Sequence, residues 1–206
     1  MGATKRVAEI CLQSYNTPDS RTRFISTRFG NVLGSNGSVV PLFEQQIAQG
    51  YLTITHSAMT RYFVSVYKAC MLILNTGLLN SQNALYVFDM GKPYSILQLA
   101  RQMIHLAGKK SSEVQIEEIG IRPGEKLHES MVEANQNTLK TEISGIYKVQ
   151  DNPYPKGMIT GWLEYMERNI GKWSETELLI SLQEICPSLP LQSKPLKTRK
   201  ETASIK

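Results

Sequence analysis

The stretch RFGNVLGSNGSVVPLF (residues 28–43) decides the fold class of this chain. Its start continues a β-rich run that begins at Arg23, and its middle is a loop of glycine, serine and asparagine of the kind that ends a strand. Its end combines Pro41 with apolar residues at helical spacing, which predicts a helix that continues to Gln49. The stretch is therefore a strand, a loop and a helix in succession, which is typical of an α/β protein.

Helical and strand patterns alternate on both sides of this unit. Residues 4–15 repeat apolar side chains at helical spacing, and residues 66–79 are apolar on most faces, as in a helix packed on both sides. Residues 84–90 read as a buried strand and residues 95–108 as an amphipathic helix between Ser95 and Gly108. Weaker patterns predict strands at 52–55 and 114–119 and helices at 127–135, 159–170 and 175–185. Only two strands are long and buried, too few for a self-contained doubly wound sheet, so we expect part of a larger α/β fold.

Length and composition indicate a folded domain with one basic end. The chain has 206 residues, of which 41% are hydrophobic and 20% charged, and this usage excludes a wholly disordered or coiled-coil protein. Residues 194–206 hold five basic residues and one acidic residue, so most of the net charge of +5 lies there. Such an end can contact RNA or an anionic membrane. Because it has no aromatic residue to stack on bases, we expect a solvated tail and no specific nucleic-acid partner.

Cysteine and histidine usage argues against disulfide and metal chemistry. Cys11, Cys70 and Cys186 are odd in number and form no CxxC pair, and the three histidines lack ligand spacing. A reducing, cytoplasmic compartment fits this pattern best. No stretch approaches the roughly 20 apolar residues of a membrane-spanning helix, so we expect no transmembrane segment.

Four short motifs follow one another along the chain. They are MGATKR at residues 1–6, RFGN at 28–31, TRYF at 60–63 and RPGEKL at 122–127. With these motifs in this order, the sequence resembles the extended short-chain dehydrogenase/reductases. Within them it is most similar to the UDP-N-acetylglucosamine 4,6-dehydratase group of polysaccharide-biosynthesis proteins.

The resemblance implies how the chain is organised. It runs from Met1 to about Glu133 and implies the C-terminal part of a Rossmann-type sheet, interleaved over residues 1–135 with a subdomain that binds a UDP-sugar. The N-terminal βαβ units of the fold are expected to be missing. Residues 136–186 are expected to form a divergent helical part, and residues 187–206 a basic, disordered tail.

The catalytic motif of the family, YxxxK, falls on the first helix. By resemblance, Lys5 is the catalytic lysine that also binds the nicotinamide ribose, and Met1 stands at the tyrosine position, where a thioether cannot act as an acid or base. The alternative for Lys5 is a solvated lysine on a frayed first turn. The family's glycine-rich turn, which receives the dinucleotide pyrophosphate, has no counterpart here. The resemblance therefore implies NADP or NAD in intact relatives, and we expect this chain alone to bind neither.

The substrate half of the resemblance is more complete. Asn31 resembles an asparagine that contacts the sugar diphosphate, with an ordinary turn residue as the alternative. Arg61 and Arg122 resemble a pair that clamps the diphosphate, and Glu125 resembles an acceptor for ribose hydroxyls. Four residues match the segment along the uracil, although any helix start could use them: Val40, Pro41, Leu42 and Phe43.

The resemblance implies a truncated nucleotide-sugar dehydratase of surface polysaccharide biosynthesis. In intact relatives, some of them attached to the inner membrane, C4 of the sugar is oxidised with bound NADP, water is eliminated across C5 and C6, and hydride returns to C6. We expect this chain to keep the UDP-sugar site and to be inactive alone, because the cofactor carries the redox chemistry. The alternatives are a non-catalytic remnant, a half that docks on a separately encoded N-terminal half or forms a homo-oligomer, and a UDP-sugar 4-epimerase-like protein.

Overall fold

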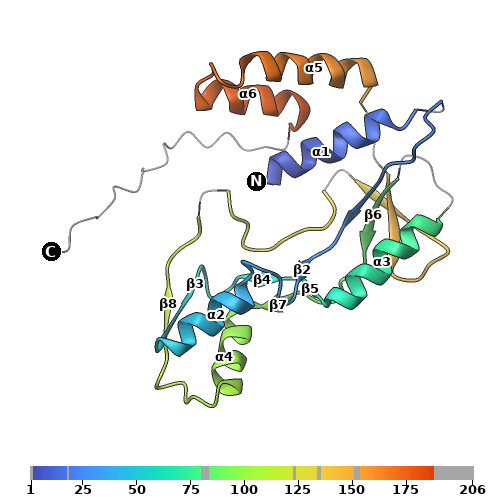
Figure 1. Cartoon of the computed structure of the whole chain (residues 1–206). Coiled ribbons are helices and arrows are strands. Elements are labelled where there is room, and N and C mark those ends of the chain that lie inside the picture. Colours follow the sequence, from blue (N-terminus) through green and yellow to red (C-terminus); the bar gives the residue numbers. More distant parts are fainter. Residues whose placement is uncertain are drawn as a thin grey trace.

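The computed structural model describes residues 2–17, 19–79, 84–122, 124–133, 136–150 and 154–187. Helices and strands alternate, as the sequence predicts (Figure 1). The helices are α1 (Gly2–Tyr15), α2 (Val39–Ala48), α3 (Val66–Leu78), α4 (Ile96–Leu106), α5 (Lys156–Asn169) and α6 (Glu175–Ile185). The strands are β1 (Ile25–Arg28), β2 (Asn31–Val32), β3 (Tyr51–Ile54), β4 (Thr60–Arg61), β5 (Phe63–Val64), β6 (Ala84–Phe88), β7 (Tyr94–Ser95), β8 (Gln115–Glu118), β9 (Asn137–Lys140) and β10 (Ile146–Gln150).

The main sheet has four strands in the order β1-β6-β10-β9. β1 and β6 are parallel, whereas β10 runs antiparallel to both β6 and β9. All five residues of β6 are buried, and alternate side chains face opposite sides of the sheet. Helix α1 covers one face of the sheet and α3 lies on the other (Figure 1). This is the partial Rossmann-type α/β arrangement that the sequence predicts.

A second core holds the segments between β2 and β8. Helix α2 packs against β3, which pairs in parallel with β8, and α4 packs against both α2 and β3. The most buried members of this core are Phe43, Leu52, Ala100 and Ile104, each at most 2% exposed. The apolar spacing in this region predicted two helices and one strand, and the structure confirms them as α2, α4 and β3.

Helices α5 and α6 pack on the outer side of α1 (Figure 1). Ile10 of α1 shares a core with Ile159, Trp162 and Ile185, and the Trp162 indole N–H donates to Ser181 at 3.1 Å. Both helices were predicted from sequence. Burial raises the pKa of the Cys11 and Cys186 thiols in this same cluster, so both cysteines belong to the packing.

Three expectations from the sequence are wrong. Helix α3 is not packed on both sides, because only Ala69 and Thr76 are buried along it. The described residues 124–133 contain no helix, since this segment extends beside β4 and Thr60 forms a parallel bridge with His128. Residues 136–150 are not helical either but form the β9–β10 hairpin, whose second strand pairs with β6.

The β9–β10 hairpin has a sequence signal that the prediction did not use. Gly145 adopts a positive φ of 80° at the turn, a conformation that favours glycine. Ile146 and Val149 then face opposite sides of the sheet and are both buried, at 1% and 3% exposure. Residues 136–150 therefore continue the sheet that the first 135 residues begin.

Gly30, which separates β1 from β2, lies against the backbone of Tyr62. An added Cβ would overlap the Tyr62 carbonyl oxygen and would lie 2.6 Å from the Tyr62 Cβ. We expect Gly30→Ala to lower the free energy of unfolding by about 1–3 kcal/mol, because backbone cannot yield as a flexible side chain can. Urea denaturation followed by circular dichroism measures the loss.

The matched control for this substitution is Gly161→Ala. Gly161 lies inside α5 with nothing within 4 Å of an added Cβ, so alanine should stabilise the protein by about 0.5–1 kcal/mol. A Gly30→Ala protein as stable as wild type would show that the β1–β2 connection tolerates a side chain.

Candidate functional site

The site begins where β1 ends. Asn31 follows Gly30 and pairs with Phe63, and its backbone N–H donates to the Tyr62 carbonyl oxygen at 2.7 Å. β2, which carries Asn31, therefore lies beside β5, and Arg61 on β4 comes two residues before β5 in the chain. The fold brings together two predicted substrate residues that are 30 positions apart in the sequence.

Arg61 is held in place by four protein groups. Its side chain is 10% exposed, and its Nε lies 3.2 Å from Glu129 Oε1 while its Nη2 lies 3.5 Å from Glu125 Oε1. Its Nη1 donates to the carbonyl oxygens of Thr60 at 2.7 Å and Leu127 at 3.1 Å. The two carboxylates neutralise the guanidinium. A contact between Arg61 and a diphosphate therefore stays a prediction. It would require the diphosphate to replace one of these four protein groups.

Glu125 links Arg61 to Arg122. One oxygen of the Glu125 carboxylate faces Arg61, and the other accepts the backbone N–H of Arg122 at 3.3 Å. The Arg122 side chain is exposed and has no hydrogen bond or ion pair within the described part of the chain. Arg122 is thus a cation available to an anion, placed by the same carboxylate that positions Arg61.

The N-terminus of α2 offers a second polar group. Ser38 is the N-cap residue, but its hydroxyl accepts no cap hydrogen bond, and its Oγ is buried without any partner among the described residues. No acidic side chain occupies the first turn of α2. The first amides of a helix have no partner inside it, and the helix dipole makes this end favourable for an anion.

The four residues predicted to lie along the uracil differ in exposure. Val40 and Pro41 are half-buried and Leu42 is 47% exposed, so these three can reach a ligand at the start of α2. Phe43 is 1% exposed and packs into the core with Ile47 and Leu52. The expectation for Phe43 is corrected on this point, because a side chain at the centre of a core supports the helix and leaves no surface for a base.

Lys5, on α1, shares no hydrogen bond or ion pair with these residues. It is exposed on the first turns of α1 and makes no hydrogen bond or ion pair with the described residues. Met1 lies outside the described residues, as does the basic end from residue 188 onward. The predicted catalytic position therefore stays a prediction.

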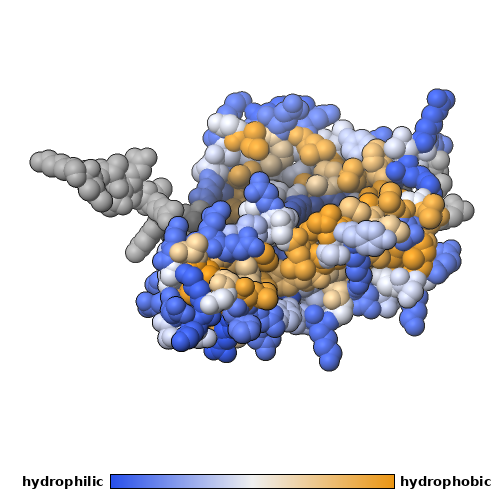
Figure 2. Space-filling view, turned by 60° about the horizontal axis from the view of Figure 1, so that its bottom comes forward, coloured by the Kyte–Doolittle hydropathy of each residue, from blue (hydrophilic) through white to orange (hydrophobic). Residues whose placement is uncertain are grey.

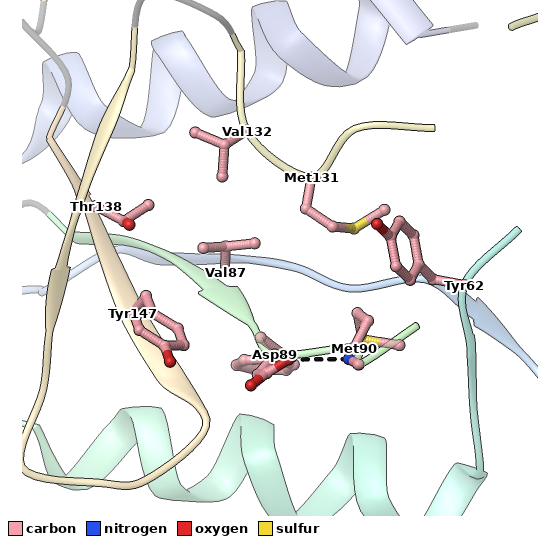
Figure 3. A pocket seen from close by; sticks show the side chains of 10 residues that line it. Tyr62, Val87, Asp89, Met90, Met131, Val132, Thr138 and Tyr147 are labelled. Atoms are coloured by element: carbon pink, nitrogen blue, oxygen red, sulfur yellow. Dashed lines mark hydrogen bonds between the residues drawn. The ribbon is translucent and has the colours of Figure 1, made fainter. Parts of the chain in front are cut away.

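A cavity of about 300 Å³ opens at the end of β6 (Figure 3). Tyr62 and Met131 line one part of it and Thr138 and Tyr147 of the β9–β10 hairpin another, with Val87 of β6 at its base. None of the predicted substrate residues lines this cavity, although Tyr62 directly follows Arg61. Sequence reasoning missed it because its wall combines distant segments and includes Thr138 and Tyr147 of the hairpin, which was not predicted.

Asp89 marks the carboxyl end of β6 in this cavity. Its Oδ1 accepts the backbone N–H of Gly91 at 2.9 Å (Figure 3). The position directly after a buried parallel strand was a usable sequence signal, since ligands of open α/β sheets bind at the carboxyl ends of the strands.

The described residues do not fit a dinucleotide. Its pyrophosphate needs a parallel strand that leads through a glycine turn into a helix with open first amides. β1 continues into β2, and β6 continues through Gly91 to β7 and α4, where Ser95 already accepts the N–H of Gln98. Neither parallel strand of the main sheet ends in such a helix, and α2, which follows β2 and its glycine loop, has Pro41 without an N–H in its first turn. Within the same residues, no group of three histidine, cysteine or acidic side chains could hold a metal ion.

Comparison with known proteins places this arrangement in context. Residues 1–151 match the family model for "Polysaccharide biosynthesis protein". The chain is 44% identical over 173 residues to the capsular polysaccharide biosynthesis protein CapD of Staphylococcus aureus, which covers 84% of this chain and 29% of that protein. It is 34% identical over 152 residues to the UDP-N-acetylglucosamine 4,6-dehydratase (inverting) of Campylobacter jejuni, which covers 72% of this chain and 43% of that enzyme.

A solved structure agrees with the fold. Pen from Bacillus thuringiensis superposes with a TM-score of 0.64 and 31% identity over 75% of this chain and 48% of its own. The chain thus spans between 29% and 48% of the length of these relatives. No helix among the described residues is long and apolar enough to cross a bilayer.

Proposed function

This chain belongs to the polysaccharide biosynthesis protein family, and from that premise we propose that it binds a UDP-sugar as the substrate-binding part of a 4,6-dehydratase-like enzyme. The observation that carries the proposal is the clustering of Asn31, Arg61, Arg122 and Glu125 beside the β1 end. These residues come from three segments that the fold brings together. The similarity to a UDP-N-acetylglucosamine 4,6-dehydratase supports the choice of sugar nucleotide.

Each group has a chemical task in this proposal. The exposed Arg122 guanidinium pairs with the diphosphate, for which its planar fork of donors is suited. The open amides and the unpartnered Ser38 hydroxyl at the start of α2 bind polar atoms of the nucleotide, and Leu42 lies against its base. Glu125 holds both arginine-bearing segments in register and accepts from a ribose hydroxyl.

The proposal concerns the binding of a UDP-sugar and assigns no catalytic turnover to this chain. Oxidation at the sugar needs nicotinamide, and the described residues do not fit the dinucleotide that carries it. The alternatives of a non-catalytic remnant and a 4-epimerase-like protein share the same sugar-nucleotide site, because all three need the diphosphate clamp.

Titration calorimetry with UDP tests the proposal. We expect UDP to bind and uridine to bind at least tenfold more weakly, because charge-assisted hydrogen bonds to phosphate contribute about 1.5–3 kcal/mol each. Arg122→Ala should weaken UDP binding about tenfold or more for the same reason. The matched control is Lys126→Ala, which removes an exposed cation from the same segment and should change affinity by less than threefold.

Two outcomes would contradict the proposal. One is a folded protein, shown by circular dichroism, that gives no heat with UDP or UDP-N-acetylglucosamine. The other is equal weakening by Arg122→Ala and Lys126→Ala, which would indicate general attraction of an anion to a basic segment.

A further inference from the structure

The cavity at the carboxyl end of β6 has polar side chains in its wall that the strand register places together. β10 pairs antiparallel with β6 and sets Tyr147 opposite Val87. The pairing continues past β6, because the Asp89 N–H donates to the carbonyl oxygen of Gly145 at 2.8 Å. Alternate side chains of a strand share one face, so Val87, Asp89 and Tyr147 lie on the same face of the sheet. Thr138 of β9 lies on this face as well, since it pairs with the residue two positions after Tyr147.

Two further segments complete the wall. Met131 and Val132 pack against the apolar side chains of the same face. Tyr62 lies in the connection between β4 and β5 and points toward Met131 (Figure 3). The volume of about 300 Å³ is at the small end of the range for sites that bind small molecules. The cavity therefore suits a ligand with a single ring.

The polar side chains of the wall have unused hydrogen-bonding groups. The hydroxyls of Tyr62, Thr138 and Tyr147 make no hydrogen bond with any described residue. The Asp89 carboxylate accepts the Gly91 N–H at 2.9 Å with Oδ1, and its Oδ2 has no partner in the same part of the chain. Three hydroxyls and one carboxylate oxygen around one cavity are therefore available to a ligand.

These groups select the chemistry of the ligand. An apolar molecule would bury them without hydrogen bonds, which costs free energy. An anion would meet Asp89, and no basic side chain is among the described residues that line the cavity. An ammonium group only donates hydrogen bonds, so the O–H groups of the wall would lack an acceptor. A neutral sugar has hydroxyls that both donate and accept, and its C–H faces can pack on aromatic and thioether side chains.

The exposed apolar surface of the molecule has no such selectivity. Figure 2 shows apolar surface gathered in the part of the molecule where α3 lies, and Leu74 and Leu78 of α3 are 68% and 79% exposed. Aliphatic side chains offer no hydrogen-bonding group, so they do not distinguish one polar ligand from another. The hydroxyls and the carboxylate of the β6 cavity do distinguish them.

We propose that the cavity at the end of β6 binds a neutral monosaccharide, at a site separate from that of the sugar nucleotide. None of the predicted substrate residues lines the cavity. Arg61 forms ion pairs with Glu125 and Glu129. The next residue, Tyr62, points toward Met131 instead (Figure 3). The inference therefore requires no bound nucleotide and does not rest on the proposed function.

Ligand-observed NMR with the whole chain tests the inference. The probes are glucose and glucuronate, which differ only at C6, where glucuronate carries a carboxylate. We expect saturation transfer to glucose without any nucleotide present, and about tenfold weaker binding of glucuronate because Asp89 repels its charge. Tyr147→Phe should weaken glucose binding about fivefold, since it removes one hydroxyl and keeps the ring. Asp89→Asn keeps an Oδ1 acceptor for the Gly91 N–H and should reduce the difference between the two probes to about threefold or less.

The matched control is Tyr165→Phe on α5, which removes the hydroxyl of a tyrosine that is 53% exposed and should change glucose binding by less than about twofold. Equal effects of Tyr147→Phe and Tyr165→Phe would overturn the proposal, as would a folded protein that gives no saturation transfer to glucose. Loss of the glucose signal on saturation with UDP would also overturn it, because the cavity would then belong to the nucleotide site. The glucose titration needs no UDP, so the monosaccharide site and the proposed function fail separately.

Discussion

Replacing Arg28 with leucine is expected to lower the free energy of unfolding by about 3–5 kcal/mol, because Glu9 would lose the arginine that binds both of its oxygens in a partly buried ion pair. Arg28 Nε and Nη2 donate to the two oxygens of Glu9 at 2.8 and 2.7 Å, and the paired side chains are 16% and 17% exposed. Arg28 Nη1 donates to the Met131 carbonyl oxygen and to Gln136 Oε1. One side chain thus joins α1, β1 and the segment before β9.

Urea denaturation at neutral pH measures this loss. Arg6 also contacts Glu9 at 3.2 Å and would keep part of the carboxylate compensated, so we expect the lower end of the range. The control is Arg168→Leu in α5, where the pair with Glu164 has side chains 73% and 58% exposed and should contribute less than about 0.5 kcal/mol. If Arg28→Leu cost no more than Arg168→Leu, the Arg28–Glu9 pair would not be what holds α1 on the sheet.

Phe43→Ala is expected to destabilise the protein by about 3–5 kcal/mol, because it leaves a cavity in the core between α2, β3 and α4. Leu42→Ala, one residue earlier and 47% exposed, should cost less than about 1 kcal/mol because its side chain already faces solvent. Denaturation and UDP titration of both variants distinguish support of the helix from contact with a ligand.

The two positions should give opposite results. Phe43→Ala should lose stability, whereas Leu42→Ala should keep stability and bind UDP more weakly. A Phe43→Ala protein of wild-type stability would contradict the core assignment. A Leu42→Ala protein with unchanged affinity for UDP would remove the start of α2 from the proposed site.

Local sequence rules determined most helices of this protein. Ser95 caps α4 by accepting the Gln98 N–H at 3.3 Å, and Gly108 ends that helix with a φ of 71°, both as predicted. Capping and glycine turns depend on residues that are close in the sequence, so the chain encodes them without reference to its fold. The order of the four short motifs likewise indicated the family, because each motif consists of residues that are neighbours in the sequence.

The tertiary structure alone decided the partners. Arg61 meets Glu125 and Glu129, more than 60 residues away, and these carboxylates pair with the guanidinium that the motif predicts to bind a diphosphate. β10 joins β6 across a similar distance, which made a hairpin of a segment with little strand pattern of its own. The sequence by itself therefore determined most helices and the family, because those depend on neighbours along the chain. Only the folded structure decided which charges are paired and which faces of α3 and β1 stay open, because those depend on residues far apart in sequence.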